Sequence, residues 1–208
     1  MGGITMTAKA GDHTQHRQPD GSAWPMPPQD GYTVDDYFAL DLPPHTEMID
    51  GSLVFVSPQR KFHSLVMFLL ELGLRQTIPE HLRVRREMAV ILTHKTVPEP
   101  DLVVVTAESD GEDELTRYQA SDVVLAIEVV SPDSESRDRD TKPLKYAAAG
   151  IPHFWLVEMD PRTKRPVVHT HIRSATGHGY EPTGVHRDRL KVDAPFTIDI
   201  DLGEYDRL

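Results

Sequence analysis

The sequence contains no cysteine among its 208 residues. Without thiols the protein cannot form a disulfide, and no thiolate can bind a metal ion or act as a nucleophile. It also lacks the run of about eighteen apolar residues that a membrane-spanning helix needs. Residues 1–22 have no apolar segment of the kind found in secretory signals. We therefore expect a cytoplasmic protein that does not enter a membrane.

Positive charge is scarce as well. The chain has 22 Lys and Arg residues against 33 Asp and Glu residues, a formal net charge of -11. This balance argues against a protein that coats nucleic acid through bulk electrostatics. It remains compatible with an enzyme that contacts nucleic acid briefly, because carboxylates that hold a metal ion themselves add negative charge.

Composition divides the chain into two parts. Residues 1–30 are rich in Gly, Pro, His, Gln and Asp and show no hydrophobic period, so they cannot bury enough apolar surface to offset chain entropy. We predict a disordered N-terminal tail over residues 1–30 and one domain over residues 31–208, which is long enough to bury a core.

The domain shows both helical and strand patterns. Asp50-Gly51 is a strong turn signal within a hairpin over Thr46–Val56. Apolar spacing and capping signals predict three helices, at Tyr32–Ala39, Phe62–Gln76 and Asp138–Ala149. Short runs rich in Val, Ile and Leu predict five further strands, at Met88–Leu92, Leu102–Val105, Val123–Val130, Phe154–Val157 and Val167–Ile172. This order predicts an α/β protein with a mixed sheet.

Two carboxylates occupy unusual positions in these strands. Asp101 directly precedes Leu102–Val105, and Glu128 interrupts the most apolar strand, Val123–Val130. A charge buried in such a strand is costly unless a partner or a metal ion compensates it. If the two strands are antiparallel neighbours, Asp101 lies beside Glu128. Together with a backbone carbonyl, that of Val129, they form an oxygen-rich site suited to Mg²⁺ or Mn²⁺.

Such an ion lowers the pKa of a bound water and neutralises charge that develops on a phosphate. Lys142 is the first candidate for a cation beside the nucleophile, because the helix after Glu128 can return across the strand ends. Lys145, about one turn further on, is the second, and Tyr146 either covers the site or packs in the core. The alternative is that Glu128 pairs with a basic residue only to fix the strand register.

A set of short motifs resembles a known family. The motifs are Glu47–Gly51, Ser57-Pro58, His63, Pro100-Asp101, Ile127–Pro132, Asp138–Lys142 and Tyr146–Trp155. Their combination covers most of residues 31–175 and is similar to the bacterial family of putative restriction endonucleases, a branch of the PD-(D/E)XK nuclease superfamily. The resemblance implies a restriction-endonuclease-like core, in which a central mixed β-sheet is flanked by helices.

By this resemblance, Asp101 is the aspartate of the "PD" element and Glu128 is the glutamate of the second element. The superfamily lysine is expected two residues after that glutamate, where this chain has Val130. The family's lysine lies in the next helix, and Lys142 occupies the matching position. Glu47 and His63 also match family positions: Glu47 as a further acidic group and His63 as a residue that lines the site, with packing or capping as the alternative for each.

Two other polar features have weaker support. His169 and His171 alternate on one strand and share a face, which can begin a zinc or iron site, but no third carboxylate ligand follows at suitable spacing. The arginines of residues 83–86 are expected to contact backbone phosphate.

We therefore expect a metal-dependent endonuclease that uses Mg²⁺ or Mn²⁺ to hydrolyse phosphodiester bonds of nucleic acid, with DNA favoured. Cutting both strands would call for a homodimer. The alternative is a catalytically inactive binding module with a nuclease fold, which Val130 and the acidic net charge favour. A glycosidase that uses Asp101 and Glu128 as its two carboxylates is less favoured, because the sequence gives no signal of an aromatic-lined cleft.

Overall fold

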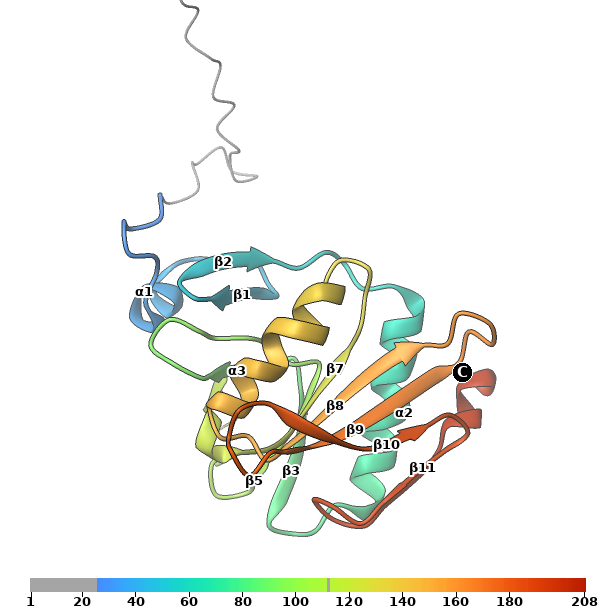
Figure 1. Cartoon of the computed structure of the whole chain (residues 1–208). Coiled ribbons are helices and arrows are strands. Elements are labelled where there is room, and N and C mark those ends of the chain that lie inside the picture. Colours follow the sequence, from blue (N-terminus) through green and yellow to red (C-terminus); the bar gives the residue numbers. More distant parts are fainter. Residues whose placement is uncertain (1–25, 112) are drawn as a thin grey trace, which may run out of the picture.

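The computed structural model describes residues 26–111 and 113–208 (Figure 1). Its centre is a six-stranded sheet in which only β7 and β8 run parallel and the other neighbours are antiparallel. In spatial order the strands are β10 (Tyr180–His186), β9 (Pro166–Arg173), β8 (His153–Met159), β7 (Val123–Val129), β5 (Leu102–Thr106) and β3 (Leu82–Arg86). This confirms the expected α/β fold with a central mixed sheet flanked by helices.

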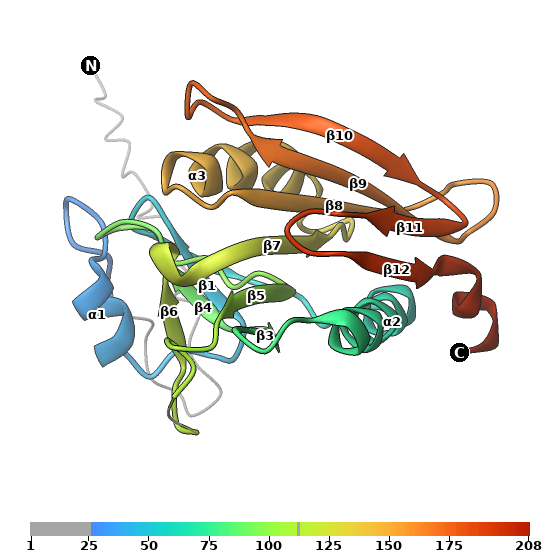
Figure 2. The ribbon, with the colours of Figure 1, turned by 90° about the horizontal axis from the view of Figure 1, so that it is seen from below.

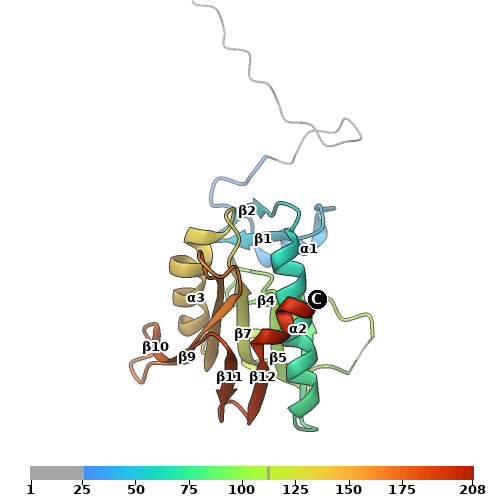
Figure 3. The same cartoon turned by 90° about the vertical axis from the view of Figure 1, so that its right-hand side faces the viewer.

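Both faces of the sheet are covered (Figures 2 and 3). Side chains alternate along each strand, so Val104 and Ile127 enter one core while Val103 and Ala126 enter the other. The first core is closed by one long helix and a hairpin, and the second by a short helix. These elements are α2 (Lys61–Thr77), β11 (Arg189–Val192) with β12 (Ile198–Asp201), and α3 (Lys142–Ala148).

The N-terminal part of the domain forms a small unit above the sheet. Helix α1 (Val34–Ala39) begins with a capping box between Thr33 and Asp36. The expected hairpin is present as β1 (Thr46–Ile49) and β2 (Ser52–Phe55). Asp50 and Gly51 form its turn with φ values of 49° and 77°, a left-handed conformation that suits a two-residue hairpin.

Several predictions of elements need correction. The segment Met88–Leu92 forms only the short strand β4 (Ala89–Ile91), which pairs with β6 (Arg117–Gln119) outside the central sheet. The predicted helix over Asp138–Ala149 is divided into a π-helical turn, η2 (Arg137–Thr141), and the shorter α3. Five strands, β3, β6, β10, β11 and β12, were not predicted. Two 3-10 turns, η1 (Ala120–Asp122) and η3 (Leu202–Arg207), complete the described elements.

The other predicted helices and strands are confirmed, with ends that differ by one or two residues. Within the described part of the chain, no helix combines the length and the apolar character needed to cross a membrane. Most of the predicted tail, residues 1–25, lies outside the described residues, so the division at residue 30 stays a prediction.

Candidate active site

Strand pairing places Asp101 opposite Glu128. Strands β5 and β7 are antiparallel with Leu102 opposite Ile127, and Asp101 lies one residue before β5. Asp101 Oδ2 accepts a hydrogen bond of 2.6 Å from the Val129 backbone N–H, which fixes the carboxylate at the end of β7. Its other oxygen, Oδ1, lies 2.8 Å from His63 Nε2 on α2.

Glu128 points to the face of the sheet that α3 covers, and its side chain is 2% exposed. Lys142 Nζ donates a hydrogen bond of 3.1 Å to Glu128 Oε2. Tyr146, one helical turn later, donates its hydroxyl hydrogen to Glu128 Oε1. Lys145 instead contacts Asp50 at 2.6 Å in the hairpin turn. Of the two candidate lysines, only Lys142 therefore reaches the paired strands.

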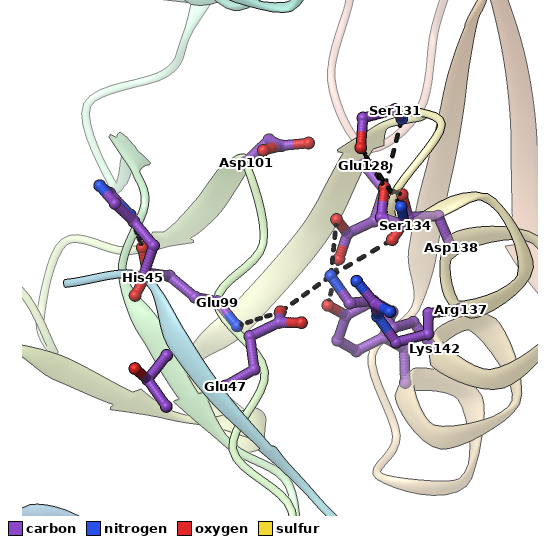
Figure 4. A network of polar contacts seen from close by, with 12 residues as sticks. His45, Glu47, Glu99, Asp101, Glu128, Ser131, Ser134, Arg137, Asp138 and Lys142 are labelled. Atoms are coloured by element: carbon purple, nitrogen blue, oxygen red, sulfur yellow. Dashed lines mark hydrogen bonds and ion pairs between the residues drawn. The ribbon is translucent and has the colours of Figure 1, made fainter. Parts of the chain in front are cut away.

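Two more carboxylates surround the same ammonium group (Figure 4). Lys142 Nζ lies 2.8 Å from Glu47 Oε1 and 3.3 Å from Asp138 Oδ1. The second contact is an ion pair without hydrogen-bond geometry, since Asp138 Oδ1 has no hydrogen-bond partner. Asp138 Oδ2 accepts a hydrogen bond from Ser134 Oγ. Figure 4 shows Lys142 between these groups, with Asp101 on the segment that leads into β5.

The role of Asp138 was missed at the level of sequence, where it counted only as part of a motif and of a polar loop. Its spacing of four residues from Lys142 was the available signal, because residues i and i+4 of a helix share a face. The π-helical turn η2 joins them, and π-bulges of this kind are frequent at functional sites.

The charges in this group are unevenly matched. Burial by itself would lower the pKa of Lys142, but attraction to Glu128, Glu47 and Asp138 outweighs it and holds that pKa well above its usual value. Lys142 is therefore an ammonium ion at neutral pH. Burial raises the pKa of the Glu128 carboxyl well above its usual value; Lys142 opposes this shift, and the neighbouring carboxylates Asp138, Asp101 and Glu47 add to it. Four carboxyl groups, Asp101 included, therefore surround one ammonium group, and a further cation would favour their ionised forms.

The side chains line a small recess with a free volume of about 30 Å³. Because one water needs about 10–15 Å³ of such space, the recess has room for a small cation and about one water. Glu47 Oε2 and His63 Nδ1 are buried there without a hydrogen-bond partner. Carboxylate oxygens around a small space are the donors that Mg²⁺ and Mn²⁺ prefer, so the residues fit a hard divalent cation.

Three of the carboxylates are arranged around the ammonium group of Lys142, and the group as a whole is not arranged as a set of metal ligands. Among residues 26–111 and 113–208, no group of three or more His, Asp or Glu side chains is placed to hold a metal ion. The carboxylate oxygens of Asp101 already contact His63 and the Val129 backbone N–H. Those of Glu128 already accept hydrogen bonds from Lys142 and Tyr146. Ion binding would therefore require some of these oxygens to exchange protein partners for the metal.

The remaining polar candidates lie outside the recess. His169 Nε2 is 3.5 Å from a carboxylate oxygen of Glu158, and the His171 ring packs against Phe154. Neither histidine belongs to a group that could hold a metal ion among the described residues. The three arginines of β3 already have partners within the protein. Arg85 pairs with Asp110, and Arg86 pairs with Glu71. Arg83 donates hydrogen bonds to backbone carbonyls.

Comparison with known proteins agrees with the fold. A crystal structure of a protein from Anabaena variabilis, described as a putative nuclease, superposes with a TM-score of 0.63 over 83% of this chain and 96% of that chain. The two sequences are 16% identical, so this likeness establishes the fold alone. A search of curated proteins gives no match. A family model described as "putative restriction endonuclease" matches residues 34–202, and the chain belongs to this family, Uma2.

Proposed function

We propose that the protein is a metal-dependent endonuclease that hydrolyses phosphodiester bonds, with DNA as its substrate. The observation that carries this proposal is the buried ammonium group of Lys142. It lies within 3.3 Å of oxygens from Glu47, Glu128 and Asp138, in the recess that Asp101 also lines. Carboxylates that can hold a metal ion, with an ammonium group beside them to offset charge on a phosphate, are groups that a metal-assisted phosphodiesterase can use.

Asp101, Glu128 and the backbone carbonyl of Val129 would hold Mg²⁺ or Mn²⁺. When bound, such an ion lowers the pKa of a water molecule and offsets charge on the phosphate.

The protein's own groups divide the remaining tasks. Lys142 is protonated, so it cannot accept a proton; it can donate a hydrogen bond to the attacking water and offset negative charge on the phosphate oxygens. Glu47 Oε2 is a buried acceptor without a partner, so it can accept a hydrogen bond from the same water and orient its lone pair toward phosphorus. Tyr146 and Asp138 hold Glu128 and Lys142 in place.

A second candidate is a catalytically inactive nuclease-fold module that binds nucleic acid. Two observations favour it: Val130 occupies the superfamily's lysine position, and Lys142 is 5% exposed with its charge already matched by carboxylates.

Plasmid nicking tests the two candidates directly. Supercoiled DNA is incubated with Mg²⁺ or Mn²⁺ and the wild type, Asp101→Ala or Lys142→Ala, with circular dichroism to verify folding. Lys145→Ala is the matched control, because Lys145 lies on the same helix but contacts Asp50 instead of the recess. We expect nicking by the wild type and by the control, and a loss of about 100-fold or more in the other two, the size seen when a charge-stabilising donor is removed.

Two results would contradict the proposal that the protein is an endonuclease with this active site. Calorimetric binding of Mn²⁺ without cleavage of duplex DNA, single-stranded DNA or RNA would favour the inactive module. Nicking that survives in folded Asp101→Ala would show that the activity comes from elsewhere.

A further inference from the structure

A second hollow adjoins the acidic recess. Its volume is about 550 Å³, within the range of about 300–1,000 Å³ that is typical of small-molecule sites. The two cavities share three lining residues, His45, Glu87 and Glu99. A group in the hollow and a phosphate in the recess would therefore be neighbours.

The far wall of the hollow is apolar and fixed. Tyr37 and Phe38 on α1 line it together with Met88. The Tyr37 hydroxyl donates to the Thr46 backbone carbonyl, and the Tyr37 ring meets Phe38 edge to face at a centroid distance of 4.9 Å. The Arg117 guanidinium covers Phe38 at 4.1 Å from its centroid. These contacts hold the aromatic wall in place before any ligand arrives, which lowers the entropic cost of binding.

The near wall carries hydrogen-bond acceptors. His45 Nδ1 lies 2.6 Å from Glu99 Oε1, and the Glu99 backbone N–H donates to Glu47 Oε1 at 2.9 Å. The hollow is thereby connected through Glu47 to the group around Lys142.

The charge of the residues that line the hollow determines which ligands it can bind. Among the described residues that line the hollow, Asp41, Glu87 and Glu99 are acidic and none is Lys or Arg. His45 is paired with Glu99, and the Arg117 guanidinium lies over the Phe38 ring, so the remaining carboxylates disfavour a phosphate there. A flat neutral ring with amino hydrogens would contact the apolar wall and donate to the carboxylates, as cytosine does to Asp and Glu side chains.

We propose that this hollow binds one unpaired nucleobase that carries an exocyclic amino group: adenine, cytosine or guanine. The proposal rests on the proposed function and names its substrate class. The preferred nucleic acid is single-stranded, or is a duplex from which one base has been turned out. The base occupies the hollow while its own strand leads a phosphate into the recess.

Binding is tested apart from cleavage. A short single-stranded DNA with one 2-aminopurine is titrated in EDTA, and its fluorescence reports capture of the base. Thr116→Trp fills the hollow from its rim, because Thr116 is an exposed lining residue. Thr176→Trp, at an exposed threonine that does not line the hollow, is the matched control. We expect affinity to fall about tenfold or more in the first variant, in keeping with the loss of one base-stacking contact, and to stay unchanged in the second.

A further variant and competing DNA strands identify the ligand that binds in the hollow. Phe38→Ala removes part of the wall and should weaken binding in the same way. The same strand with thymine in place of 2-aminopurine, assayed by competition, should bind more weakly, and so should the fully paired duplex. The proposal is overturned if Thr116→Trp binds the DNA as tightly as the wild type. It is also overturned if the thymine strand competes as well as the 2-aminopurine strand, or if an oligosaccharide binds in the hollow and releases the DNA.

The two proposals can fail separately. If Thr116 and Phe38 control binding but no protein nicks DNA, the base site stands and the nuclease proposal falls. If the wild type and Thr116→Trp both nick DNA with equal rates on single and double strands, the nuclease proposal stands and the base site falls.

Discussion

At Lys142, one ammonium ion faces three buried carboxylates. Removing water from such ions costs several kcal/mol each, and the 2.8–3.3 Å contacts offset that cost only while every partner is present. The same residue that we propose for catalysis therefore also stabilises the fold. Loss of activity on its substitution has two possible causes, which stability measurements separate.

The stability of Lys142→Met provides that separation. Methionine fills a similar space but leaves Glu47, Glu128 and Asp138 without their cation, so we expect the free energy of unfolding to fall by about 3–5 kcal/mol, the usual cost of breaking a buried ion pair. Urea denaturation measures it. Lys145→Met should lose less than about 1 kcal/mol, because its partner Asp50 is 71% exposed. Equal losses in the two variants would contradict this account of Lys142.

Asp138→Asn tests a positioning role without removing the amine. The amide keeps the hydrogen bond from Ser134 but removes one of the negative charges beside Lys142 Nζ. We expect kcat for nicking to fall about tenfold, equivalent to about 1.4 kcal/mol of transition-state stabilisation, while KM stays unchanged. Steady-state nicking kinetics measure both constants. A rise in KM at constant kcat would instead assign Asp138 to substrate binding.

At the scale of elements, α2 holds the face of the sheet opposite α3. It packs against the C-terminal hairpin β11–β12 through Gly73, where an added Cβ would lie 2.5 Å from the Ile200 side chain. Both residues are buried, so neither has space to move aside. A glycine in mid-helix, which costs about 1 kcal/mol against alanine, is kept here for close approach.

We therefore expect Gly73→Ala to destabilise the protein by about 1–3 kcal/mol, because overpacking outweighs the gain in helix propensity. Thermal denaturation checks the prediction. Gly111→Ala is the control, since a Cβ there meets nothing within 4 Å. In an Ile200→Ala background, Gly73→Ala should cost less than in the wild type, because the atoms that its Cβ would meet are gone. A more stable Gly73→Ala protein would show that α2 and β12 separate freely.

The elements that sequence analysis found are those with a strong local period. The apolar face of α2 and the Val-rich strands β5 and β7 specify their own structure. Strand β3 was not predicted, because only Leu82 and Val84 are buried and they alternate with arginines, so its period of two rests on two apolar residues. Strands β6, β11 and β12 have only three or four residues, and β10 has seven but no buried side chain, so pairing with neighbours determines all four.

In the candidate site, too, some residues could be placed from local patterns and others depend on how the elements pack together. Asp101 and Glu128 could be placed together because an antiparallel register fixes the ends of two strands. Lys142 followed from the position of the next helix. The contacts of Glu47 and Asp138, and the hollow beside α1, depend on how the hairpin and η2 dock onto the sheet, which no local pattern encodes.

At the scale of the whole molecule, three histidines lie on consecutive strands and outside the lining of the recess: His153 on β8, His171 on β9 and His186 on β10. Burial lowers the pKa of each below its usual value; for His171, the nearby His169 lowers it further. In the unfolded chain these groups titrate near pH 6.5, as in model peptides. Between that pH and their lower folded values, the unfolded chain binds more protons, so the stability that they contribute is lost as pH falls.

Two carboxyl groups have the opposite effect on stability. Burial raises the pKa of both Glu128 and Asp138. As pH falls, the folded protein therefore binds their protons before the unfolded chain does, and the stability that they contribute rises. A comparison of variants isolates the histidines. Between about pH 7.5 and about pH 5.5, on either side of the usual histidine pKa, we expect His153→Gln to lose less thermal stability than the wild type, because glutamine takes up no proton. His178→Gln, at an exposed loop position, should lose as much as the wild type. The same loss in all three proteins would mean that His153 accepts its proton in the folded state without penalty and that the acid sensitivity of the fold arises elsewhere.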